Sequence, residues 1–140
     1  MTGAIIAVDV GSVRLGVAIA ERADLPAMPL TTLTHTSRKA DVDAIVALAR
    51  ERGARTIVIG YPLRLDGSAG PAAGRIDRFV EALRESFDGD VATFDERLTT
   101  AAASKKLMQG ELSGSRRREI VDRLAAVEIL ESYLSGVRRG

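Results

Sequence analysis

The chain contains 140 residues, of which 46% are hydrophobic and none is cysteine, and its formal net charge is +1. This length suits a single domain over residues 1–140 with a core of its own, and the hydrophobic fraction argues against disorder. The lack of cysteine excludes disulfides, thiolate zinc sites and a cysteine nucleophile. The nearly neutral charge excludes a chain that is strongly basic throughout.

The basic residues are unevenly distributed. Residues 101–140 contain eight Lys and Arg against five Asp and Glu, so this segment is +3 while the first hundred residues are −2. A solvated helix face and a phosphate-contacting patch explain this equally well. No apolar run reaches the roughly 18 residues of a membrane span, and the N-terminus lacks the basic part of a signal peptide. We expect a soluble, cytoplasmic protein with no membrane partner.

The first third of the chain predicts three strands. Residues 4–8 form a short apolar, β-branched run, which is typical of a strand buried on both faces. Residues 15–20 predict a second strand that pairs with the first as a hairpin. Residues 30–33 predict a third strand at an edge of the sheet, because Pro26 and Pro29 cannot donate to a ladder.

The rest of the chain alternates helices and strands. Ser37 predicts the start of a helix that Gly53 ends, and residues 56–60 predict a strand parallel to the first. The remaining expected elements are a helix at 72–87, a strand at 91–94, a helix from Thr99 or Thr100 to Met108, a glycine-serine linker at 110–115 and a long helix at 116–134. This order predicts an α/β fold: a five-stranded mixed sheet with helices on both faces.

Acidic residues follow two of the predicted strands. Asp9 ends the first strand, and Asp95 and Glu96 end the last. In parallel sheets ligands bind beyond the carboxyl ends of the strands, so these acids would share an edge. A turn residue is the ordinary alternative for a single Asp in such a place.

Asp122 lies in the most apolar stretch of the long helix. On a helix it shares a face with Ala125, Ala126 and Ile129. An isolated buried carboxylate is costly and requires a cation or hydrogen bonds. A metal ion and an arginine partner, such as Arg123, Arg118 or another Arg, both meet this need, and the pattern does not choose between them.

Three carboxylates without cysteine would form an oxygen-only site that suits Mg²⁺ or Mn²⁺ better than zinc. Two such ions can hydrolyse a phosphodiester without a protein nucleophile. His35, the only histidine, is expected to be an exposed polar residue.

Four segments of the chain form an ordered set of motifs: residues 9–18 (DVGSVRLGVA), 58–63 (VIGYPL) with 66–68 (DGS), 95–100 (DERLTT), and 121–130 (VDRLAAVEIL) with Tyr133 and Leu134. In this order they resemble the YqgF or RuvX family of RNase H-fold proteins. The resemblance implies catalytic, metal-binding roles for Asp9, Glu96 and Asp122, with Asp95 the nearest competitor of Glu96.

The same resemblance suggests residues that contact nucleic acid. Arg14 matches the basic residue of the first segment, and Arg97 and Thr99 match the third. Val13 replaces a residue that is often basic, and Arg64 stands where Asn is common. Independently of the family, basic residues flank the linker where phosphate contacts would suit them: Lys105, Lys106, Arg116, Arg117 and Arg118.

The family implies a metal-dependent nuclease in the 5′ maturation of precursor 16S rRNA, acting on structured or single-stranded RNA or within ribosomal precursor particles. A resolvase acting on branched DNA is the alternative, and the chain could be a monomer or a homodimer. Two rival classes stay open. An Asp-x-Gly after a buried strand also begins the phosphate loop of actin-like and sugar-kinase folds. A non-catalytic assembly factor would bind nucleic acid without cutting it, although aromatics are only 4% of the chain and base stacking is not expected to dominate.

Overall fold

The computed structural model describes residues 3–62, 70–96 and 114–139; for residues 115–117 and 139 it describes the backbone alone. The elements are β1 (Ala4–Val10), β2 (Arg14–Ala20), β3 (Met28–Thr34), α1 (Arg38–Glu51), β4 (Ala54–Tyr61), α2 (Pro71–Ser86), β5 (Asp90–Asp95) and α4 (Ser115–Arg139).

The strands form one sheet in the order β3-β2-β1-β4-β5. β1 pairs antiparallel with β2, and β2 antiparallel with β3, whereas β4 is parallel to β1 and β5 is parallel to β4. The mixed sheet and the edge position of the third strand are confirmed. Pro29 lies next to a register shift between β2 and β3, as expected of proline in an edge strand.

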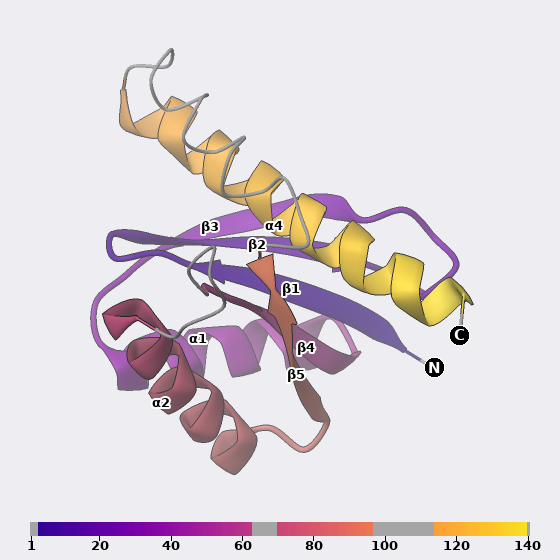
Figure 1. Ribbon diagram of the computed structural model, residues 1–140, viewed down its shortest axis with the longest axis horizontal. Helices are drawn as coiled ribbons and strands as arrows, with labels where there is room; N and C mark the ends of the chain where they lie inside the picture. Colours follow the sequence, from indigo (N-terminus) through magenta and orange to yellow (C-terminus); the bar gives the residue numbers. More distant parts are fainter. Residues whose placement is uncertain (1–2, 63–69, 97–113, 140) are drawn as a thin grey trace.

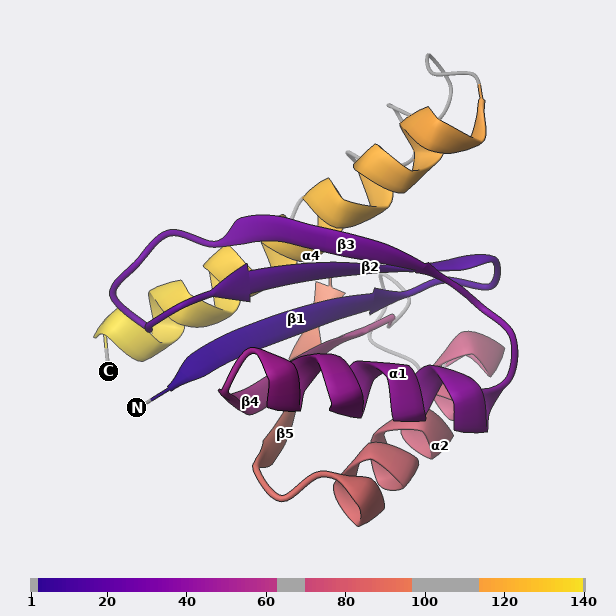
Figure 2. The ribbon, with the colours of Figure 1, turned by 180° about the vertical axis from the view of Figure 1, so that it is seen from behind.

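Helices cover both faces of this sheet, as predicted. α1 and α2 lie on one face, and α4 crosses the other (Figures 1 and 2). Alternate residues of β1 divide between the two cores: Ile6 and Val8 belong to the cluster under α1 and α2, and Ile5 and Ala7 to the cluster under α4. The direction of a side chain along its strand therefore determines whether it packs against α1 and α2 or against α4.

The helix boundaries follow from local chemistry. The Ser37 hydroxyl accepts a hydrogen bond from the Ala40 backbone N–H at 3.1 Å, and Gly53, at φ 68°, follows the end of α1. α2 lies within one residue of its predicted ends.

α4 is longer than the predicted 116–134 and continues to Arg139. The extra turn has tertiary partners, because the Arg138 guanidinium donates to the backbone oxygens of Ala23 and Leu25 at 2.8 and 2.7 Å. The predicted helix at 99–108 and most of the 110–115 linker lie outside the described residues. Within the described ranges, no helix has the length and apolar character that crossing a bilayer requires.

Candidate active site

Asp9 lies near the carboxyl end of β1, opposite Gly16 of β2. The residue is only 8% exposed, although it is a carboxylate near the end of its strand. Alternation along β1 puts Asp9 on the same face as Ile5 and Ala7, which is the α4 face. The end of the central strand therefore presents a nearly buried acid toward α4.

At Gly16 the backbone of α4 comes very close to the sheet. A Cβ built on Gly16 would lie 2.0 Å from the backbone oxygen of Asp122. Only glycine permits this approach, which is a recognised reason for glycine inside a strand. Asp122 is 2% exposed and sits above the residue that pairs with Asp9. Two acids that are far apart in sequence thus belong to one small region.

Asp122 has an arginine partner. The Arg14 Nε–H donates to Asp122 Oδ2 at 2.7 Å, and the two side chains are 16% and 2% exposed. The arginine-paired alternative is therefore realised, but by Arg14 of β2 rather than by Arg123 or Arg118 of the same helix.

Glu96 follows β5 and reaches the same face. A Cβ built on Gly60 of β4 would lie 2.7 Å from Glu96 Oε1 and 2.8 Å from Ile129 Cδ1, so the Glu96 side chain rests on Gly60 beside α4. Gly60 is one residue beyond Ile59, the β4 partner of Val8 in β1. Asp9 is likewise one residue beyond Val8. Glu96 therefore lies over β4, at the level of Asp9 in the neighbouring strand β1.

Asp95 differs from its neighbour in direction. Its register partner is Tyr61, and the preceding pair is Gly60 with Phe94. Phe94 packs in the α4-side cluster, whereas Tyr61 packs against the cluster of the opposite face. Alternation along β5 therefore directs Asp95 toward the opposite face.

The structure thus brings Asp9, Glu96 and Asp122 to one face at one end of the sheet, from three separate elements. Among the described residues, no group of three or more His, Asp or Glu side chains is gathered closely enough to hold a metal ion. The donor chemistry fits a hard divalent cation, since all three groups are carboxylates. In the structure as it stands, Asp122 is engaged by Arg14.

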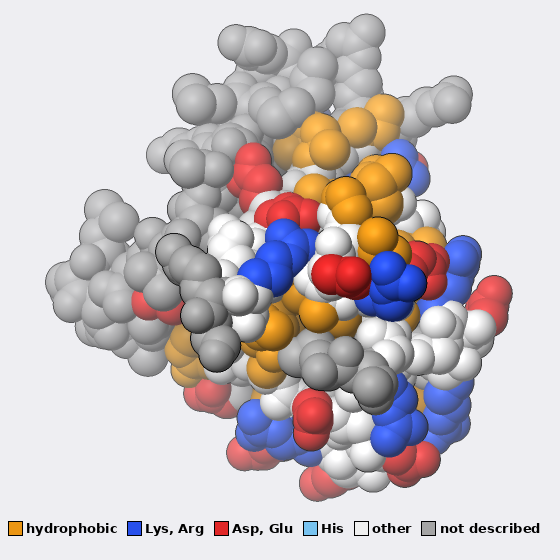
Figure 3. All heavy atoms as spheres, turned by 90° about the vertical axis from the view of Figure 1, so that its right-hand side faces the viewer, with side chains coloured by type: hydrophobic (Ala, Val, Ile, Leu, Met, Phe, Trp, Pro, Cys, Tyr) orange, Lys and Arg blue, Asp and Glu red, His pale blue; other side chains and the backbone are white. Residues whose placement is uncertain are grey.

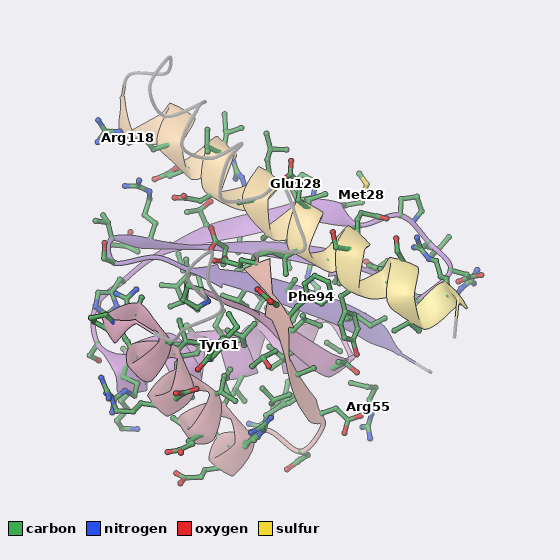
Figure 4. All side chains as sticks on the ribbon, in the orientation of Figure 1. Met28, Arg55, Tyr61, Phe94, Arg118 and Glu128 are labelled. Carbon is green, nitrogen blue, oxygen red and sulfur yellow. The ribbon has the colours of Figure 1, made fainter. Side chains whose placement is uncertain are left out.

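The other predicted residues are placed only in part. Arg118 is exposed near the start of α4, well away from the end that carries the C-terminus (Figure 4). Arg116 and Arg117 belong to α4, but their side chains are not described. The remaining predicted contacts lie outside the described residues: Arg64, Arg97, Thr99, Lys105 and Lys106.

His35 is exposed, as predicted, but it has a structural partner. Its Nδ1 makes a hydrogen bond of 2.5 Å with Asp41 Oδ2, while Asp41 Oδ1 accepts from the Thr36 backbone N–H at 3.2 Å. This hydrogen-bonded pair links the end of β3 to the start of α1. Neither His35 nor Asp41 belongs to the candidate site of Asp9, Glu96 and Asp122.

The charge at the opposite end of the molecule is mixed. Figure 3 views the side where both chain termini lie, and acidic and basic side chains are interspersed over it. That end carries the amino ends of β1, β4 and β5, so it is not the edge at which the carboxylates gather.

Sequence reasoning missed two glycines. Gly16 and Gly60 admit Asp122 and Glu96, respectively, to the surface of the sheet. The signal was available, because an isolated glycine within a strand pattern indicates close approach of another group. What the sequence could not supply was the identity of that group.

Comparison with known proteins assigns the chain to a family. The model of the family described as "RuvX: Holliday junction resolvase" matches residues 3–136. The chain belongs to the RuvX family. The predicted membership is therefore confirmed, and the description of the family is that of a nuclease.

Individual RuvX relatives cover nearly the whole chain. A protein from Clostridium perfringens is 36% identical over 135 residues, which are 96% of this chain and 98% of that protein. One from Myxococcus xanthus is 39% identical over 130 residues, or 93% of this chain and 86% of that protein. Both carry the name "Putative pre-16S rRNA nuclease".

Solved structures confirm the RNase H-like fold of this RuvX chain. Thermus thermophilus RuvC in complex with a Holliday junction substrate superposes with a TM-score of 0.61 at 14% identity, covering 98% of this chain and 96% of that one. The fowlpox virus resolvase bound to Holliday junction DNA gives 0.56 at 10% identity, covering 96% and 98%. At these identities the likeness concerns the fold alone.

Proposed function

We propose that this RuvX chain is a metal-dependent nuclease that hydrolyses phosphodiester bonds in the 5′ maturation of precursor 16S rRNA, in the cytoplasm. The observation that carries the proposal is the placement of Asp9, Glu96 and Asp122 on the α4 face at the carboxyl end of the sheet. The names of the relatives support RNA as the substrate. This RNA would be cut either free or within ribosomal precursor particles.

The three carboxylates would hold Mg²⁺ or Mn²⁺. They are oxygen donors, and Asp9 and Asp122 are 8% and 2% exposed, so a cation here would be shielded from bulk water and strongly attracted. A pair of such ions, when bound, supplies an activated water and stabilises the leaving oxygen of the phosphodiester.

The chain's own residues position these groups. Asp9 is positioned by its pairing with Gly16 in a strand that has neighbours on both sides, and Asp122 by the contact of α4 with Gly16. Glu96 is supported by Gly60 and Ile129. No side-chain nucleophile is required by this chemistry. Substrate phosphates would be met by the predicted contacts: Arg14, Arg64, Arg97, Thr99, Lys105, Arg116, Arg117 and Arg118.

Glu96 rather than Asp95 is the acid we assign to the site. The support is direction: Glu96 lies over Gly60 on the α4 face, whereas Asp95 pairs with Tyr61 and points to the other face. Asp95→Asn is therefore a matched control for Glu96→Gln, because the two changes remove neighbouring charges.

A second candidate function is cleavage of branched DNA, favoured by the description of the matching family as a Holliday junction resolvase. It would use the same carboxylates. It would also call for a symmetric dimer, since two related cuts require a two-fold axis.

The test compares precursor 16S rRNA with a synthetic four-way junction, each in Mg²⁺, Mn²⁺ or EDTA. We expect wild type and Asp95→Asn to cut the RNA with either ion. Asp9→Asn and Glu96→Gln should lose at least about a hundredfold in rate while still binding RNA. Symmetric paired nicks in the junction with little RNA cleavage would favour the resolvase. Binding of RNA without cleavage of either substrate would favour an assembly factor.

A further inference from the structure

Arg14 and Asp122 form a partly buried ion pair, with Asp122 2% exposed, that the proposed reaction does not by itself explain. We propose that Arg14 is a positioning residue: its guanidinium serves as the internal cation of Asp122 and yields that carboxylate to the divalent ion when the ion binds. This inference rests on the proposed function, because it assigns Asp122 to the metal site.

The position of Arg14 is set by a tight turn. The Gly11 backbone N–H donates to the Arg14 carbonyl at 3.0 Å, and a Cβ on Gly11 would lie 2.6 Å from that oxygen. Arg14 is the first residue of β2, and the hairpin partner strand β1 carries Asp9. One hairpin therefore delivers both the guanidinium and a carboxylate to the same end of the sheet.

Direction along β2 agrees with this placement. Ala18 and Ala20 pack in the cluster under α4, and alternation puts Gly16 and Arg14 on that face as well. Arg14 thus reaches Asp122 from the same side as Asp9. Because Gly16 holds the α4 backbone against β2, the Asp122 carboxylate is brought to this spot by packing.

Electrostatics explains why a cation must be present. Asp122 is 2% exposed, and a carboxylate buried to this extent is costly without a compensating charge. A guanidinium remains charged at every ordinary pH, so the Arg14 partner is permanent in the metal-free protein. The 2.7 Å bond ends on Asp122 Oδ2, an oxygen that a bound ion would also attract.

The Arg14 guanidinium and the divalent ion would compete for the Asp122 carboxylate. The ion pair lowers the free energy of the metal-free state and so lowers metal affinity. Once displaced, the Arg14 guanidinium would be left beside the carboxyl edge, where the proposed site brings a phosphodiester of opposite charge. Metal binding and phosphate binding would then favour each other through Arg14.

The test measures Mn²⁺ binding by calorimetry, without nucleic acid, in wild type, Arg14→Gln and Arg14→Lys. The control is Arg123→Gln, which removes the same charge from the residue next to Asp122 but leaves the Arg14 bond intact. Melting temperatures are measured in EDTA and in Mn²⁺. Asp9→Asn reports on the proposed metal site itself.

We expect Arg14→Gln to bind Mn²⁺ roughly tenfold or more tightly than wild type, since a charge-assisted hydrogen bond no longer competes. It should melt lower than wild type in EDTA and gain more from Mn²⁺. Arg123→Gln should change affinity by less than about threefold, because its effect is only long-range. Arg14→Lys, which keeps a charge, should gain less affinity than Arg14→Gln and takes its place if that variant does not fold.

Equal or weaker Mn²⁺ binding by Arg14→Gln, relative to Arg123→Gln, would overturn the exchange while leaving the metal site intact. If wild type and Arg14→Gln both bind no Mn²⁺, the metal part of the proposed function is wrong and the exchange is wrong with it. A positioning role also requires a kinetic signature: Arg14→Gln should reach half its maximal rate at lower Mn²⁺, with a lower maximal rate.

Discussion

Replacing Gly16 with alanine tests whether the approach of α4 to the sheet builds the site. The added Cβ would lie 2.0 Å from the Asp122 backbone oxygen, 2.3 Å from its carbonyl carbon and 3.0 Å from the Arg123 nitrogen. All three are backbone atoms of one helix, so no side-chain rotation can relieve the contact. The helix or the strand must move by roughly 1 Å or more before these atoms reach ordinary separation.

The magnitude follows from overpacking in a dense core. Such insertions cost about 1–3 kcal/mol, which corresponds to a fall of roughly 2–12 °C in melting temperature for a domain of this size. The effect on rate should be larger in proportion, because a displacement of about 1 Å near reacting groups can cost around a hundredfold. Thermal unfolding and RNA cleavage in Mn²⁺ measure the two effects separately.

Gly136→Ala is the matched control in α4. Nothing lies within 4 Å of a Cβ at Gly136, so alanine there should be neutral or stabilise the helix by up to about 1 kcal/mol. A Gly16→Ala protein with unchanged melting temperature and full activity would refute the idea that this contact sets the position of Asp122.

Three further predictions concern single contacts. In Gly60→Ala the three atoms nearest the new Cβ belong to the side chains of Glu96 and Ile129, so stability should fall by less than about 1.5 kcal/mol while cleavage falls at least about tenfold. Asp41→Ala removes a 5% exposed acceptor and should cost about 1–3 kcal/mol, measured by urea unfolding. The hydrogen bond that Tyr61 donates to Asp77 at 2.9 Å raises the pKa of the Tyr61 phenol, so Asp77→Asn should lower that pKa in an absorbance titration.

The last two of these predictions have controls within the chain. Asp43→Ala breaks an exposed pair with Lys39 and should change stability by less than about 1 kcal/mol; an equal loss in both Asp variants would contradict the role of burial. Tyr61→Phe identifies which of the two tyrosines moves in the titration, and a phenol pKa that ignores Asp77→Asn would show that the hydrogen bond is not its cause.

Most of the fold could be predicted because the signals were local. Apolar runs marked β1 and β4, Ser37 and Gly53 bounded α1, and the prolines put β3 at an edge. The end of α4 could not, because Ser135 and Gly136 are poor helix formers. The last turn is held by bonds from Arg138 to the loop after β2, and such distant partners leave no local pattern.

The site residues likewise divide into those with a local sequence signal and those placed by distant contacts. Asp9 and the pair Asp95 and Glu96 could be found from strand ends, but the choice between the last two required the register of β5 against β4. Arg14, a partner of Asp122, is 108 residues away in sequence, and the packing of α4 on Gly16 makes the two residues neighbours.

The late position of α4 in the sequence has a consequence for how the protein comes into being. During synthesis the five strands, α1 and α2 leave the ribosome before α4, since a chain is made from its amino end, so Ile5, Ala7 and Val58 lack the cover of α4 until Ser115–Arg139 has emerged. The same helix brings Asp122. A newborn chain is therefore incomplete in core and in chemistry together, so the cutting activity we propose would begin only in a molecule that has finished folding.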